Sequence, residues 1–202
     1  MPDPKPPCLP LAADQRVAGR GFCDPVHTEA DLAILTRLRD ALKRASAGRR
    51  SNAMRFADEV GVHNIAVPDW AALEAPRPVA LIGFFGQARE EVDHAPIVAL
   101  EQAIVARAAA FPGLLAYHNA RLTGGNWGNL VAFASRAETA GVVCDSTHLS
   151  AVAMTSRHYA SLRLHRGVLA DGCLGGVAAV IDETLYLDFG ESPAWRALRT
   201  YG

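Results

Sequence analysis

The sequence predicts an α+β protein built on a ferredoxin-like split βαβ unit, with an N-terminal helical extension and a C-terminal added strand. A continuous apolar run over Val79–Gly86 is typical of a buried central strand. Gly124 and Gly125 separate two strand-like segments, as in a tight hairpin. With the helical patterns between and after these segments, the order becomes strand, helix, strand, strand, helix, strand.

Length and composition limit the classes of protein. The chain has 202 residues, which suits one domain with an extension. Its 20 basic and 21 acidic residues give a net charge of −1, so we expect no nucleic-acid or membrane partner. The four cysteines are scattered, which indicates free thiols and a cytoplasmic protein. We find no apolar run long enough for a membrane span and no signal-peptide pattern.

Residues 1–78 are expected to form a flexible tail, an amphipathic helix and a wrapping arm. Met1–Pro10 is rich in proline and is expected to stay flexible. The helix is predicted from about Glu29 to Ala45, before Gly48. Its apolar stripe consists of Leu32, Leu35, Leu38 and Leu42. Three prolines and weak periodicity in Met54–Pro78 indicate an arm that wraps the following domain, residues 79–202.

The helices and strands of the second part follow from local signals. Asp93 and Pro96 suit the start of a helix whose apolar stripe ends at Phe111. Ser146–Arg157 reads as a second helix, and Ala160–Val168 alternates as a strand. Val177–Phe189 adds at least one further strand. Two aromatic side chains close to the end of the chain, Phe189 and Trp195, predict that the C-terminal segment packs on the core.

The hairpin predicts which side chains share a face of the sheet. If Gly124 and Gly125 are the two turn residues, His118 faces Val131, Ala120 faces Asn129, and Leu122 faces Trp127. This register places His118, Trp127 and Asn129 on one face. Both faces then mix polar and apolar residues, so we expect both to be covered and one to enclose polar groups.

Three segments resemble antibiotic biosynthesis monooxygenase-like proteins of the dimeric α/β barrel superfamily. They are Asn126–Phe133, Ser146–His148 and Arg157–Gly167, within a likeness that covers about Val79–Leu169. The resemblance implies a homodimer whose two sheets close into a barrel, with a small-ligand pocket between each sheet and its helices. It also implies oxidation of an electron-rich aromatic or polyketide-like substrate without a cofactor. Asn126, Asn129 and Trp127 match an Asn and a Trp of that pocket.

Haem is the alternative cofactor that the resemblance implies, because related proteins bind and degrade haem. Those proteins use an Asn near the first strand, a Trp on the third strand and a helix His. Trp127 and His148 could match the last two, but the first strand here carries Gly83 and Phe84. No histidine or carboxylate spacing in the sequence indicates a metal site.

The candidate site residues follow from the hairpin register and the resemblance. We assign His118, Asn129 and Trp127 as catalytic, His118 being the base that removes a substrate proton. The candidate substrate-binding residues are Asn126, Arg121, Phe133 and His148. Each has a structural alternative as a core, turn or surface residue. The expected function is a cofactor-independent monooxygenase; the alternatives are a non-catalytic dimeric small-ligand binding module and a haem-binding or haem-degrading protein.

Assembly is predicted from the amount of apolar strand surface. The apolar faces at Val79–Phe85 and Leu162–Leu164 exceed what two amphipathic helices can cover. We therefore expect a homodimer formed through the sheets.

Overall fold

The computed structural model describes residues 7–48 and 51–202. The strands are β1 (Leu9–Leu11), β2 (Ala53–Ala57), β3 (Gly61–Ala66), β4 (Val79–Ala88), β5 (Leu114–Leu122), β6 (Trp127–Phe133), β7 (Tyr159–Leu169), β8 (Val180–Asp188) and β9 (Trp195–Thr200). The α-helices are α1 (Pro25–Ala47), α2 (Trp70–Glu74), α3 (Ala95–Ala106), α4 (Thr139–Val143) and α5 (Ser146–His158). Short 3₁₀ turns lie at Gly21–Cys23 and Ala108–Ala110.

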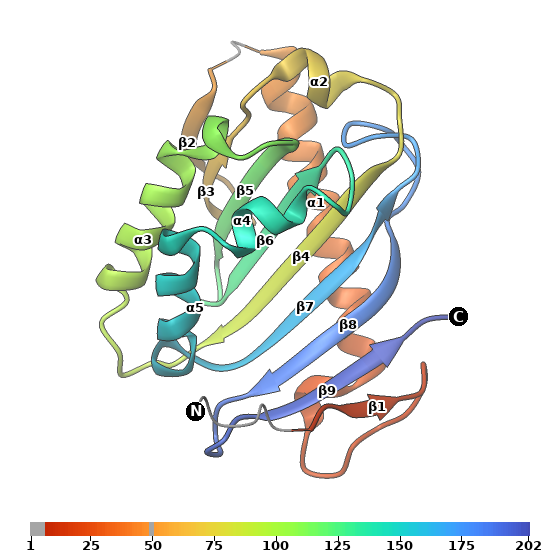
Figure 1. The fold of residues 1–202 in the computed structure, drawn as a ribbon, viewed down its shortest axis with the longest axis vertical. Coiled ribbons are helices and arrows are strands. Elements are labelled where there is room, and N and C mark those ends of the chain that lie inside the picture. Colours follow the sequence, from red (N-terminus) through yellow and green to blue (C-terminus); the bar gives the residue numbers. More distant parts are fainter. Residues whose placement is uncertain (1–6, 49–50) are drawn as a thin grey trace.

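All described strands belong to one mixed sheet, in the order β1-β9-β8-β7-β4-β6-β5-β3-β2. Only the pairing of β1 with β9 is parallel. Helix α1 crosses one face of this sheet, and α3, α4 and α5 cover part of the other (Figure 1). We call these the α1 face and the α3–α5 face.

The predicted ferredoxin-like split βαβ unit forming a dimeric α/β barrel is wrong. The described residues form a single nine-stranded sheet with five α-helices. Residues of the predicted wrapping arm form β2 and β3, and β3 pairs with β5. The sheet therefore includes strands from both sides of the predicted boundary at residue 79. These strands are short and separated by a tight turn, and their partner lies over fifty residues away along the chain. Their backbone hydrogen bonds therefore leave little local sequence signal.

Helix α1 is confirmed, and it begins four residues before the predicted start. Asp24 caps it by accepting a hydrogen bond from the Val26 amide at 3.2 Å, and Pro25 occupies the first turn. The buried stripe packs on β4 and β6; its members are Leu35, Leu38 and Leu42. A Cβ at Gly83 would lie 3.2 Å from Leu35 Cδ1, so this glycine allows the helix to approach β4 closely.

Helix α3 begins one residue after the predicted cap. Its N-cap is His94, which makes no side-chain cap hydrogen bond, while the preceding Asp93 accepts from the Ala95 amide at 2.9 Å and Pro96 lies in the first turn as predicted. At α5 the cap is Asp145, which accepts from the amides of Thr147 and His148. The expectation that both sheet faces are covered, one around polar groups, is confirmed for the region of β4, β5 and β6.

The hairpin between β5 and β6 is confirmed, but its predicted register is wrong. Three residues, Thr123–Gly125, form the loop, because the Leu122 amide donates to the Asn126 carbonyl at 2.9 Å. Gly125 has a φ of +82°, the left-handed conformation expected for glycine in such loops. Asn119 therefore pairs with Asn129, and His118 pairs with Leu130. A shift of one residue in the register moves a side chain to the other face of the sheet. His118 therefore lies on the face that does not carry Trp127 and Asn129.

The C-terminal segment packs on the core, as predicted. Trp195 joins an apolar cluster with Leu11, Cys23 and Tyr186, and Phe189 packs on the cluster around Trp127. Trp195 begins β9, an additional strand that the sequence patterns did not identify.

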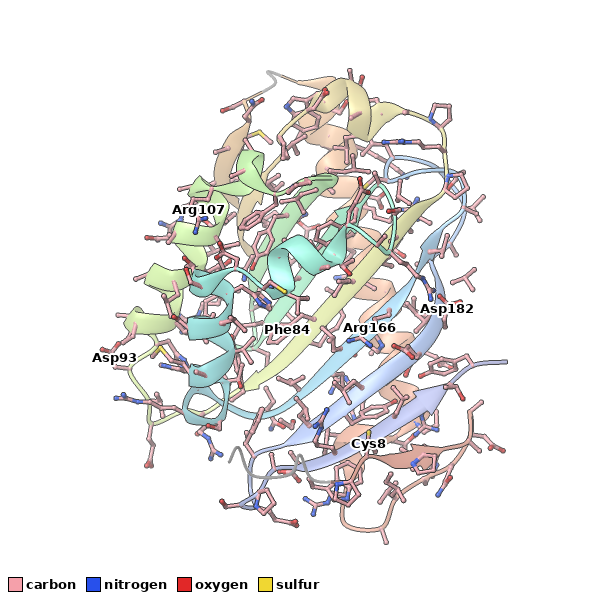
Figure 2. All side chains as sticks on the ribbon, viewed as in Figure 1. Cys8, Phe84, Asp93, Arg107, Arg166 and Asp182 are labelled. Carbon is pink, nitrogen blue, oxygen red and sulfur yellow. The ribbon has the colours of Figure 1, made fainter. Side chains whose placement is uncertain are left out.

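Part of the α3–α5 face is not covered by any described helix. Figure 1 shows β8 and β9 open on the side where α3 and α5 cover the other strands. Arg166 lies on this open surface (Figure 2), where its Nη1 donates to Glu183 Oε1 at 2.6 Å. Leu164, Leu185 and Leu198 face each other directly across β7, β8 and β9, and all three are half-buried.

Two expectations concern the ends and the surroundings of the protein. The predicted flexible tail, Met1–Pro10, falls partly on residues 1–6, which lie outside the described residues. Its last residues belong to β1, which pairs with β9. Among the described helices, none combines the length and the apolar character needed to cross a membrane.

Candidate functional site

A cavity of about 170 Å³ lies between the α3–α5 face of the sheet and the helices that cover it. Strands β4 to β7 form its floor, and α3, α4 and α5 form its walls. Most of the lining is aliphatic or aromatic, as in sites for small organic molecules. An engineered cavity of about 150 Å³ holds benzene, so this space suits a molecule with one ring.

Five polar atoms on the cavity lining are buried without a hydrogen-bond partner among the described residues. They are Glu101 Oε1, Asn119 Oδ1, Trp127 Nε1, Asn129 Oδ1 and His148 Nδ1. A buried polar group without a partner costs about 1–3 kcal/mol, so such groups are few in folded proteins. Their concentration around one cavity indicates a site that a polar ligand or ordered water completes.

Glu101 is the member of this site that the sequence patterns missed. It projects from α3 and lies four residues after Ile97 and three before Ile104, on the same buried side of the helix. Burial raises the pKa of its carboxyl to about 8. A lone acid inside an apolar helical stripe is the signal that could have identified it.

The other ionisable groups of the cavity are also uncharged at neutral pH. Burial lowers the pKa of His148, an effect that the nearby Asp145 carboxylate only partly opposes, so its imidazole is neutral. Burial raises the pKa of Tyr117, whose hydroxyl is hydrogen-bonded by the Asn129 side chain. Burial also raises the pKa of Tyr159. The lining therefore offers neutral hydrogen-bonding groups and contains no lysine or arginine.

The fold brings together four of the seven residues proposed from the sequence. Trp127, Asn129, Phe133 and His148 all line the cavity. Trp127 and Asn129 come from alternate positions on β6, and His148 reaches the cavity from the first turn of α5.

Two proposed substrate-binding residues lie outside this cavity. Arg121 is exposed, and its guanidinium carbon lies 5.9 Å from the centre of the Trp127 ring. Asn126 follows the hairpin loop, where its Oδ1 accepts a hydrogen bond from the Ala88 amide at 3.1 Å. Both proposals depended on the resemblance or on charge alone, and neither residue contacts the cavity.

The structure does not place His118 with the other two proposed catalytic residues. Its ring is fully buried on the α1 face, on the other side of the sheet from Asn129 and Trp127. His118 Nε2 lies 2.8 Å from His63 Nδ1, and His63 Nε2 lies 2.7 Å from Asp58 Oδ1. Burial lowers the pKa of His118 to about 3, an effect to which His63 adds. We therefore withdraw His118 as the base.

The cavity does not fit a haem. A space of about 170 Å³ holds one small ring, whereas a haem is a macrocycle of several rings. Within the described ranges, no group of three or more histidine, cysteine, aspartate or glutamate side chains is arranged to hold a metal ion.

Neither the scan against protein-family models nor the search of curated proteins finds a match to this chain.

Proposed function

We propose that the protein binds a small, uncharged organic molecule of about one ring in the cavity beneath α3 and α5. The observation that carries this proposal is the set of five buried polar atoms without partners on an otherwise apolar lining. A ligand that supplies both donors and acceptors would satisfy them and recover the cost of their burial.

The electrostatics of the cavity supports a neutral ligand. Glu101 and His148 are both held in their uncharged forms at neutral pH by burial. A charged molecule would lose its hydration without gaining a counter-ion, which is unfavourable by several kcal/mol. A ring with hydroxyl substituents, such as a phenol, matches the mixture of carboxyl, amide and indole groups.

Phenol is expected to bind, and replacing Asn119 by leucine should weaken this binding by about tenfold, the effect of one lost hydrogen bond. Asn119 is buried and its Oδ1 has no partner, so Asn119→Leu should leave the free energy of unfolding equal or higher. Calorimetric titration and urea denaturation measure the two quantities.

Two variants on the covering helices provide a matched test. Ala151→Phe places a ring in the cavity from α5 and should abolish phenol binding. Ala103→Phe makes the same change on the exposed side of α3 and should leave binding unchanged. Phenol binding that survives in Ala151→Phe would contradict the proposal.

Cofactor-independent oxidation of an electron-rich ring is the second candidate function. It is favoured by Glu101, whose pKa of about 8 suits a group that accepts a proton near neutral pH. Once ionised, Glu101 can remove a hydroxyl proton so that the ring anion passes an electron to oxygen, the role first assigned to His118. Oxygen uptake with catechol should then rise with pH through about 8 and fall by ~10²-fold in Glu101→Gln. If no uptake occurs while phenol binds, the protein is a binding module.

We also propose that the protein is a homodimer in which a second copy covers the open part of the sheet. The half-buried row of Leu164, Leu185 and Leu198 supports this, together with Val180, which is 56% exposed. Sedimentation should give twice the chain mass of 21.5 kDa. Leu185→Glu should produce monomers, whereas Val26→Glu on α1 should not. A wild-type monomer would contradict this prediction.

A cytoplasmic location stays a prediction. It is supported by the four cysteines, all of which are free thiols in the described part of the chain.

A further inference from the structure

A second cavity of about 440 Å³ lies at the end of the sheet near the start of α1. It is bounded by the last residues of β4, the beginning of β6 and β7, and the first turns of α1. Trp127 lines both cavities, but the polar groups of the two sites are different. The polar side chains here are His27, Asp31, Gln87, Asn126 and Arg163.

Arg163 carries the positive charge of this cavity. Its Nε and Nη2 donate to the two oxygens of Asp31 at 2.6 and 2.8 Å. Asp31 Oδ2 also accepts from His165 Nε2 at 2.8 Å. Burial disfavours the ionised form of Asp31, but these hydrogen bonds outweigh it and hold the pKa of this carboxyl below its usual range. The Asp31 oxygens are therefore engaged, while Arg163 Nη1 makes no hydrogen bond within the described residues.

Two side-chain amides of the cavity lining also have oxygens that already accept hydrogen bonds from the protein. Asn126 Oδ1 accepts from the Ala88 amide at 3.1 Å, and Gln87 Oε1 accepts from the Ser161 hydroxyl at 3.1 Å. What remains on each is an NH₂ group, which can only donate. Together with Arg163 Nη1, the cavity thus offers three N–H donor ends, and the acceptors of these side chains are already used.

Donor groups without acceptors select ligands with negatively charged oxygens. A single guanidinium, largely balanced by Asp31, suits a group with one negative charge better than a phosphate dianion. The rest of the lining is apolar and includes Phe22, Ile34 and Phe85, which would contact a hydrocarbon body.

We infer that this second cavity binds a small organic carboxylate with an apolar body, its carboxylate held by Arg163 Nη1 and the amides of Asn126 and Gln87. The site is separate from the proposed ring-binding cavity and does not depend on it.

Benzoate and its neutral analogue benzamide test this inference on the whole protein. Calorimetric titration should show benzoate binding about tenfold more tightly than benzamide or better, because hydrogen bonds to a charged group are the stronger ones. Gln87→Glu and Asn126→Asp preserve side-chain shape and place a negative charge at the donors. Both residues are exposed, and the carboxylate introduced by Asn126→Asp would still accept from the Ala88 amide, so both variants should fold. Each should weaken benzoate binding by about tenfold or more and weaken benzamide binding less, because benzamide loses one donor but meets no charge repulsion.

Two controls make the outcome decisive. Gln102→Glu adds the same charge at an exposed position on α3 and should not change benzoate binding. Ala151→Phe fills the other cavity and should also leave it unchanged. Equal affinity for benzoate and benzamide, no binding in the millimolar range, or unaltered binding in both acidic variants would overturn the inference. So would loss of benzoate binding in Ala151→Phe, which would place the anion in the first cavity.

Discussion

Replacing Arg199 by methionine is expected to lower the free energy of unfolding by ~4 kcal/mol or more. Arg199 lies on β9 and is fully buried. Its guanidinium donates to the carbonyls of Ala12, Ala13, Gln15 and Cys23. Its Nε donates to the Tyr186 hydroxyl at 3.0 Å. Methionine fills similar space without donors, so several acceptors would lose their partners at about 1–3 kcal/mol for each one that stays buried.

This arginine joins the segment before α1 to the last strand, two parts of the chain more than 170 residues apart. Urea denaturation of the purified variant measures the effect. The matched control is Arg166→Met on β7, where the guanidinium pairs with Glu183 on the surface and is 50% exposed. That variant should lose less than about 1 kcal/mol. If Arg199→Met also loses less than about 1 kcal/mol, the carbonyl contacts do not anchor the N-terminal segment.

Acid is expected to destabilise the protein through His118. Its pKa is about 3 in the folded protein and about 6.5 when the chain is unfolded. Between these values the unfolded chain binds more protons than the folded one, so stability falls as pH falls. The contribution of this group is fully present above pH ~6.5, and its loss approaches 1.4 kcal/mol per pH unit on the way to pH 3.

The measurement compares urea denaturation of the wild type and His118→Gln at pH 7 and pH 5. Glutamine keeps a hydrogen-bonding end for His63 but cannot take up a proton, so the decline with acid should be smaller by roughly 1–2 kcal/mol. Asp58 and His63 face this group in both proteins, so the comparison isolates the change at His118. Leu38→Val disturbs the same packing beneath α1 without removing a titratable group, and should retain the wild-type decline. An identical pH dependence in His118→Gln would show that another group controls acid stability.

The site was only partly predictable, because the loop between β5 and β6 is one residue longer than predicted. The paired glycines correctly located the hairpin, and Trp127 and Asn129, to which the resemblance drew attention, line the first cavity. A two-residue turn and a three-residue loop are both compatible with Gly124 and Gly125, because each needs glycine at a positive φ. The choice decides which face His118 occupies, and the sequence patterns favoured the wrong one.

Glu101 shows a different limit. Its position within an apolar stripe is visible in the sequence, but its raised pKa depends on burial against strands and helices distant along the chain. The second cavity is similar. Its donors come from β4, β7 and the loop before β6. Only in the folded sheet are the two amide oxygens hydrogen-bonded and Arg163 paired with Asp31, which leaves the remaining N–H groups for a ligand.

Local signals in the sequence were sufficient to identify several elements without knowledge of their partners. Helix α1 follows from its leucine spacing, helix α3 from its first-turn proline and apolar stripe, and strand β4 from its apolar run. Tertiary structure alone decided the nine-stranded sheet, because short strands such as β2 and β3 are stable only when paired. It also decided the two cavities, since a binding site consists of side chains brought together by packing, and their hydrogen bonds and pKa values follow from that packing.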